Sequence, residues 1–131
     1  MNKTIFGDCR DTMRQLATEG VTVQMCVTSP PYFGLRDYGH DGQIGLEETP
    51  EQYIEAMVEV FRCVKDILAD DGVLWLNIGD SYCGTGDKGD HRDPKYAEGR
   101  SAQAISKTKK LTGYKSKDLI GIPWMLAFAL R

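Results

Sequence analysis

Apolar residues recur every three or four positions in two segments, residues 9–19 and 50–69, and this period predicts two helices. Residues suited to helix boundaries stand at the ends of these segments: an aspartate N-cap, a glycine stop, and a capping box with proline at the first helical position. They are Asp8, Gly20, Thr49, Pro50 and Gln52. We expect the second helix to end at Asp70-Asp71-Gly72 and a third to span residues 119–131.

Nearly continuous apolar runs predict strands at residues 21–27 and 73–78, buried on both faces as in a parallel sheet. A short β-prone run predicts one more strand at residues 4–6. The alternation of strands and helices indicates an α/β fold with a mostly parallel sheet and flanking helices. Ligands of such sheets bind beyond the carboxyl ends of the strands, so residues 28–32 and 77–82 are expected at one ligand edge.

Composition limits the chain to one small domain, because it has 131 residues, of which 41% are hydrophobic and 27% charged. It has no apolar run of membrane-spanning length and no signal-peptide core, which predicts a cytoplasmic protein without a membrane partner. Four cysteines without a C-x-x-C pair, and only two histidines, predict reduced buried thiols and no metal site. The cysteines are Cys9, Cys26, Cys63 and Cys83.

Charge is unevenly distributed. Residues 88–117 hold seven lysines and two arginines against three acids, a net +6, whereas the whole chain carries −3. We expect a mobile basic loop at about residues 84–116, which either binds DNA phosphates or is simply a solvated, disordered segment. The candidate phosphate contacts are Arg92, Arg100, Lys107, Lys109, Lys110, Lys115 and Lys117.

The sharpest motif is Thr28-Ser29-Pro30-Pro31-Tyr32, directly after a predicted strand. Ser-Pro-Pro is also common in turns and polyproline segments, but here it stands at the expected ligand edge. An exocyclic base amine is a poor nucleophile, because its lone pair is delocalised into the ring, and it needs acceptors for its N–H protons. The Ser29 hydroxyl and the Pro30 carbonyl can accept them, while Tyr32 offers a flat face to a base taken out of the helix.

This motif resembles the catalytic motif of the amino-group DNA methyltransferases, (Asp, Asn or Ser)-Pro-Pro-(Tyr, Phe or Trp). Gly7-Asp8-Cys9 and the segments 76–82 and 117–124 also resemble parts of the permuted, β-type arrangement of that family. The resemblance implies a partial Rossmann-like fold dependent on S-adenosylmethionine and acting on double-stranded DNA. It places Ser29, Pro30, Pro31 and Tyr32 in the catalytic pocket. Residues toward the cofactor would be Asp8, Thr28, Asn77 and Asp80.

Three of those four polar residues also have a structural reading. Asp8 can serve as a helix N-cap, and Asn77 and Asp80 can serve as turn residues after a strand. Trp124 and Phe128 are expected in the core.

The family's cofactor loop, of the type Phe-x-Gly-x-Gly, is not found. Its nearest candidates, Gly42–Gly45 and Gly84–Gly86, neither follow a strand nor open a helix. We therefore expect residues 1–131 to form the N-terminal part of a catalytic domain, inactive alone, which a complementary C-terminal methyltransferase segment would complete. Serine at position 29 favours the N4 amine of cytosine as the target.

Other functions stay open beside this one. Within the same chemistry the alternative is the N6 amine of adenine. Methylation of protein glutamine is disfavoured because those enzymes carry Asn at the position of Ser29, and cytosine-C5 chemistry because the chain has no Pro-Cys nucleophile. A further alternative is a non-catalytic fragment that binds DNA or another methyltransferase subunit.

Overall fold

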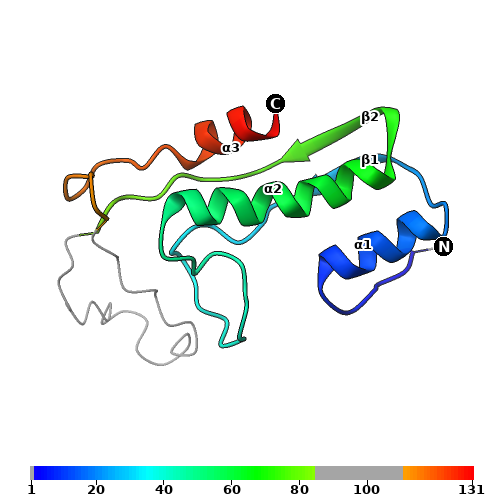
Figure 1. Cartoon of the computed structure of the whole chain (residues 1–131), viewed down its shortest axis with the longest axis horizontal. Helices are drawn as coiled ribbons and strands as arrows, with labels where there is room; N and C mark the ends of the chain where they lie inside the picture. The colour runs from blue at the N-terminus through cyan, green and yellow to red at the C-terminus, as the bar shows by residue number, and fades with distance from the viewer. Residues whose placement is uncertain (1, 85–110) are drawn as a thin grey trace.

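The computed structural model describes residues 2–84 and 111–131. The five elements of this part are α1 (Cys9–Thr18), β1 (Val23–Thr28), α2 (Pro50–Ile67), β2 (Leu68–Leu76) and α3 (Ile122–Leu130). The long helix α2 packs against α1, β2 and α3, and Figure 1 shows α1 and α3 on opposite sides of it. The fold is therefore a small α/β unit organised around one helix.

All three predicted helices form, with some boundaries moved. Asp8 caps α1, and the Thr49–Gln52 capping box opens α2, as the sequence predicts. Helix α2 ends at Ile67 rather than at residues 70–72, because the chain enters β2 at once. Helix α3 begins at Ile122 rather than at residue 119.

The sheet has two parallel strands, β1 and β2. Val23 is paired with Leu68 and Met25 with Val73, so residues 69–72 bulge out of the register where a helix end was expected. The strand predicted at residues 4–6 is wrong: this segment has no regular structure, and Phe6 is 90% exposed. Only two of the three predicted strands exist in the described part of the chain.

The core lies between α2, α3 and one face of the strands. Tyr53, Met57 and Phe61 of α2 are buried there together with Ile122 and Leu126 of α3. On the strands, Cys26, Leu74 and Leu76 are partly buried against this cluster. Since β2 and α2 are joined without a loop, the core fixes where the strand ends point.

Among residues 2–84 and 111–131, no element covers the other face of the strands. Its cross-strand pairs Met25–Val73 and Val27–Trp75 are 56%, 49%, 69% and 64% exposed, respectively. We call these four residues the open face. The expectation that the strands are buried on both faces is therefore wrong for the described residues, which provide only one layer of helices.

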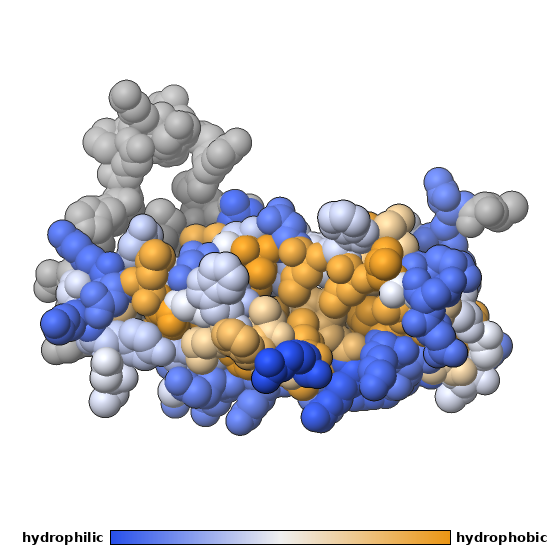
Figure 2. All heavy atoms as spheres, turned by 90° about the horizontal axis from the view of Figure 1, so that it is seen from above, coloured by the Kyte–Doolittle hydropathy of each residue, from blue (hydrophilic) through white to orange (hydrophobic). Residues whose placement is uncertain are grey.

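Two large apolar side chains of α3 are exposed as well. Trp124 and Phe128, expected in the core, are 71% and 68% exposed, because Ile122 and Leu126 take the inward positions of that helix. Figure 2 shows apolar side chains gathered across the middle of one side of the molecule with hydrophilic ones along its rim. In the part that the structure describes, no helix is long and apolar enough to cross a membrane.

Candidate functional site

Two segments meet where the parallel strands end. Thr28, the last residue of β1, pairs with Leu76, and the backbone N–H of Asn77 donates to the Thr28 carbonyl over 2.9 Å. This confirms that residues 28–32 and 77–82 share the carboxyl edge of the sheet. The Asn77 side chain is exposed and that of Thr28 half-buried at this edge.

The proline-rich loop after β1 is held by other parts of the fold. The Tyr53 hydroxyl, from α2, donates to the Pro31 carbonyl over 2.8 Å. Gly45 packs closely against the same turn, since a Cβ there would lie 3.1 Å from the Tyr32 carbonyl oxygen. The φ of Gly45, +107°, also lies in the region that favours glycine.

Two further contacts hold the residues after the prolines. A Cβ on Gly79 would lie 2.9 Å from Cε2 of Tyr32. The Tyr32 ring can occupy this position because residue 79 has no side chain. The Ser81 hydroxyl donates to the Phe33 carbonyl over 2.8 Å. The segment after β2 therefore supports the loop after β1 directly.

Two acceptors of the loop take no part in these contacts. Within residues 2–84 and 111–131, no hydrogen bond involves the Ser29 hydroxyl or the Pro30 carbonyl. Ser29 is exposed and Pro30 is half-buried. The carbonyls of Pro31 and Phe33 thus accept hydrogen bonds from the rest of the fold. The Ser29 hydroxyl and the Pro30 carbonyl, which the motif would offer to an amine, remain available to a ligand.

Asp80 joins the site edge to α3. Its carboxylate accepts hydrogen bonds from the backbone N–H groups of Ser81 (2.8 Å), Gly121 (2.9 Å) and Ile122 (2.9 Å). These groups include the first free donors of α3, whose preceding residue is a glycine without a capping side chain. Asp80 is thus engaged as the N-cap of a helix distant in sequence, beyond the turn role expected for it.

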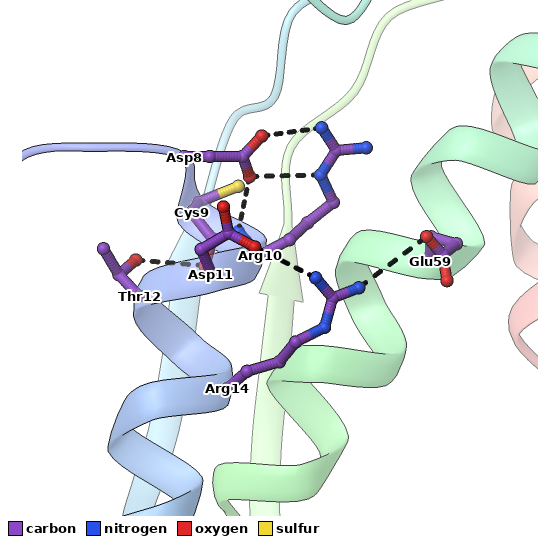
Figure 3. A network of polar contacts seen from close by, with 7 residues as sticks. All are labelled: Asp8, Cys9, Arg10, Asp11, Thr12, Arg14 and Glu59. Atoms are coloured by element: carbon purple, nitrogen blue, oxygen red, sulfur yellow. Dashed lines mark hydrogen bonds and ion pairs between the residues drawn. The ribbon is translucent and has the colours of Figure 1, made fainter.

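Asp8 is engaged as well, at the start of α1 (Figure 3). Its carboxylate accepts from the Arg10 backbone N–H over 2.8 Å and forms an ion pair with the Arg10 guanidinium over 2.6 Å. The hydrogen bonds from Arg10 lower the pKa of Asp8 to about 2. Arg14 links Asp11 to Glu59 of α2 in the same network. In the described part of the chain, no hydrogen bond or ion pair connects Asp8 to the Ser29–Tyr32 loop.

Of the predicted phosphate contacts, the structure describes Lys115 and Lys117, and both are exposed. Lys117 belongs to a short antiparallel pairing, and Lys115 lies just before it in the sequence. In this pairing the Lys117 N–H donates to the Cys83 carbonyl and the Cys83 N–H to the Asp118 carbonyl, each over 2.8 Å. We call this pairing of residues 81–83 with 117–120 the clasp. The other predicted contacts lie outside the described residues: Arg92, Arg100, Lys107, Lys109 and Lys110.

Of the four side chains predicted to lie toward a cofactor, the structure engages two in contacts within the chain. Both candidate carboxylates, Asp8 and Asp80, are already bound within the chain, which leaves the side chains of Thr28 and Asn77 at the edge. In the described residues, no three His, Cys, Asp or Glu side chains are gathered as a metal ion requires. Sequence reasoning missed Tyr53, Gly79 and Ser81, because what sets them apart is their contact with the loop and not a motif.

A proline-rich loop at the carboxyl edge of a parallel α/β sheet, with acceptors beside an aromatic ring, is a candidate site for an amine on a flat base. Comparison with known families agrees with that class. Residues 23–121 match the DNA methylase family of N6 and N4 methyltransferases, and the chain belongs to this family.

Curated relatives are Type II methyltransferases. The chain is 49% identical over 129 residues to M.SmaI of Serratia marcescens and 47% identical over 129 residues to M.Cfr9I of Citrobacter freundii. These matches cover 98% of this chain but only 42% and 41% of the relatives, so the chain spans about two fifths of their length. M.SfiI of Streptomyces fimbriatus is 50% identical over 76 residues, 58% of this chain and 18% of its own length. No solved structure matches the chain.

Proposed function

We propose that this chain carries the base-binding part of a site-specific DNA methyltransferase that acts on the N4 amine of cytosine. The observation that supports the proposal most is the Ser29–Tyr32 loop, which stands at the ligand edge with its Ser29 hydroxyl and Pro30 carbonyl uncommitted. Membership of the DNA methylase family supports methyl transfer to DNA. The choice of cytosine rests on serine at position 29.

The chemistry follows from these acceptors. As the new N–C bond forms, the bond between the methyl group and its sulfonium donor breaks, so the amine nitrogen must become more tetrahedral and then pass one proton to solvent. Ser29 and Pro30 accept its two N–H groups, which directs the lone pair away from the ring plane, and Tyr32 stacks on the extruded base. S-adenosylmethionine, when bound, supplies the methyl group, and Thr28 and Asn77 would face it at the sheet edge.

A complementary methyltransferase segment is part of this proposal. The matched part is about two fifths of each relative, and both candidate carboxylates are engaged within the chain. Among the described residues, no second layer of helices covers the open face. Parallel sheets are normally covered on both faces. We expect the chain alone to bind S-adenosylmethionine weakly and to transfer no methyl groups.

The test is a fusion of this chain to the part of M.SmaI that it does not match. DNA treated with the fusion and S-adenosylmethionine is digested to nucleosides and analysed by mass spectrometry. N4-methylcytosine is expected, and Ser29→Ala should lower the rate on the order of 10²-fold, because a transition-state acceptor is lost. N6-methyladenine instead would establish the alternative target. Robust turnover by the unfused chain would contradict the need for a complementary segment.

DNA contact by the basic segment is tested separately. Replacing Lys115 and Lys117 by glutamine in the fusion should reduce the salt dependence of DNA binding by about one unit of slope for each lost phosphate contact. A glutamine change at Lys65, an exposed residue on α2, is the matched control. If the glutamine variants of Lys115 and Lys117 show the same salt dependence as the Lys65 control, neither lysine contacts a phosphate.

A further inference from the structure

One side chain that holds the Ser29–Tyr32 loop comes from α2. Tyr53 has no exposed surface, its ring packs against Phe33 at 5.6 Å between centroids, and its hydroxyl donates to the Pro31 carbonyl over 2.8 Å. Burial raises the pKa of Tyr53 well above its usual range, so the phenol keeps its proton and remains a donor. The contact is thus built into the core.

The backbone N–H of Leu35 donates to the Tyr32 carbonyl over 3.3 Å, but the two prolines before Tyr32 depend on contacts from outside the loop. Pro30 and Pro31 fix φ but have no backbone N–H, so neither can donate a hydrogen bond to the fold. What remains free is the rotation of the peptide planes that follow them. A hydrogen bond to the Pro31 carbonyl sets the plane of the Pro31–Tyr32 peptide, and this plane determines where the Tyr32 ring is directed.

Neighbouring contacts act on the same short segment. Gly79 leaves room for the Tyr32 ring, and Ser81 donates to the Phe33 carbonyl over 2.8 Å. Three consecutive loop residues, 31 to 33, are therefore held from α2 and from the segment after β2, while Ser29 and Pro30 stay free.

We propose that Tyr53 is a positioning residue of the base pocket: through the Pro31 carbonyl its hydroxyl sets the orientation of the Tyr32 ring and of the adjacent Pro30 carbonyl. Ser81 does the same from the other side through Phe33. Neither side chain touches the base. This inference rests on the proposed function for its catalytic consequence, but the structural part can be tested without any activity.

The structural test uses the full 131-residue chain labelled with carbonyl-¹³C proline and ¹⁵N tyrosine. Pro31-Tyr32 is the only Pro-Tyr pair in the sequence, so a carbonyl–amide correlation spectrum contains one signal from it. In Tyr53→Phe, which keeps the ring in the core, we expect the Pro31 carbonyl signal to move upfield as its hydrogen bond is lost. Tyr114→Phe, also packed against the core cluster, is the matched control and should leave the signal in place.

The catalytic test uses the fusion described above. Tyr53→Phe should lower kcat on the order of 10-fold, because a misplaced reacting group costs rate even when binding persists. The KM for S-adenosylmethionine and the thermal midpoint should stay close to those of the parent. A fall in kcat without a change in these two quantities distinguishes positioning from a merely structural role. Ser81→Ala should show the same split, and Tyr114→Phe should match the parent fusion.

These outcomes separate the two proposals. A parent fusion that methylates no base contradicts the proposed function, while the carbonyl signal still decides the role of Tyr53. An unchanged Pro31 signal in Tyr53→Phe, or an unchanged kcat in an active fusion, overturns the inference. If Tyr53→Phe loses its fold by circular dichroism, Ser81→Ala takes its place in the kinetic test.

Discussion

At the scale of single residues, Asp80 shows how one carboxylate serves two elements. It lies four residues after the end of β2 and accepts the N–H groups of Gly121 and Ile122, 41 and 42 residues further along the chain. The first N–H groups of a helix lack partners within it, and their partial positive charge favours an anion. Asp80 thus fixes α3 to the ligand edge of the sheet.

Replacing Asp80 should therefore destabilise the whole unit. We expect Asp80→Ala to lower the free energy of unfolding by about 1–2 kcal/mol, as for the loss of a helix cap. Asp80→Asn should cost less, because the amide oxygen still accepts one hydrogen bond. Urea unfolding measures both, with Asp71→Ala in the exposed bulge as control. A loss for Asp80→Ala no larger than for Asp71→Ala would show that the cap does not stabilise the fold.

Asp8 gives a pH-dependent contribution of predictable sign. Its pKa is lowered in the folded state, from 3.8 to about 2, so its contribution is complete above pH 3.8 and is lost as the pH falls toward 2. Because the carboxylate is 39% exposed, we expect less than about 1 kcal/mol. Acid unfolding of the parent and of Asp8→Asn should therefore differ at pH 5 and converge near pH 2. A constant difference across that range would contradict this origin.

At the scale of elements, the capping box of α2 has the widest effect, because this helix supports both the core and the loop after β1. The Thr49 hydroxyl accepts the Gln52 N–H over 3.2 Å, and the Gln52 side chain accepts the Thr49 N–H over 3.3 Å. Thr49→Ala should cost about 1 kcal/mol of unfolding free energy. Thr112→Ala, in an exposed turn, is the control for urea titration. Equal stability of the two variants would show that Gln52 alone suffices.

The helices could be predicted from sequence because their signals are local. Caps, periodic apolar residues and Pro50 all act within a few positions, and they place α1 and the start of α2 correctly. The strands were harder, since a continuous apolar run does not say whether both faces are covered. The run at residues 4–6 shows the limit, because β-propensity without a neighbouring strand to pair with forms no strand.

The same distinction applies to the site. Parallel topology was enough to bring residues 28–32 and 77–82 to one edge, because it follows from element order alone. The contacts that shape the loop were not predictable, since Tyr53 reads as an ordinary core residue of an amphipathic helix. The commitment of Asp80 to α3 also depends on a contact 41 residues away, which no local pattern contains.

At the scale of the whole molecule, the open face should cause the isolated chain to self-associate. Met25, Val27, Val73 and Trp75 form one contiguous apolar surface beside unpaired strand edges, and such surfaces promote association. We expect self-association by sedimentation velocity and strong binding of an apolar dye. The double change Val27→Lys and Trp75→Lys should reduce both, whereas Gln24→Lys with Thr22→Lys adds the same charge and should not. Equal association of both double variants would exclude the open face as the cause.

The clasp has a consequence for how the chain tolerates change. Because residues 81–83 and 117–120 are paired, the two ends of the intervening stretch stay together whatever its length or composition. The entropy of closing a loop grows only with the logarithm of its length, by about 0.6 kcal/mol for each doubling. We therefore expect changes of length or composition between Gly84 and Leu111 to leave the contacts of residues 31–33 intact, whereas Leu111 itself is buried in the core and should not tolerate replacement by a polar residue.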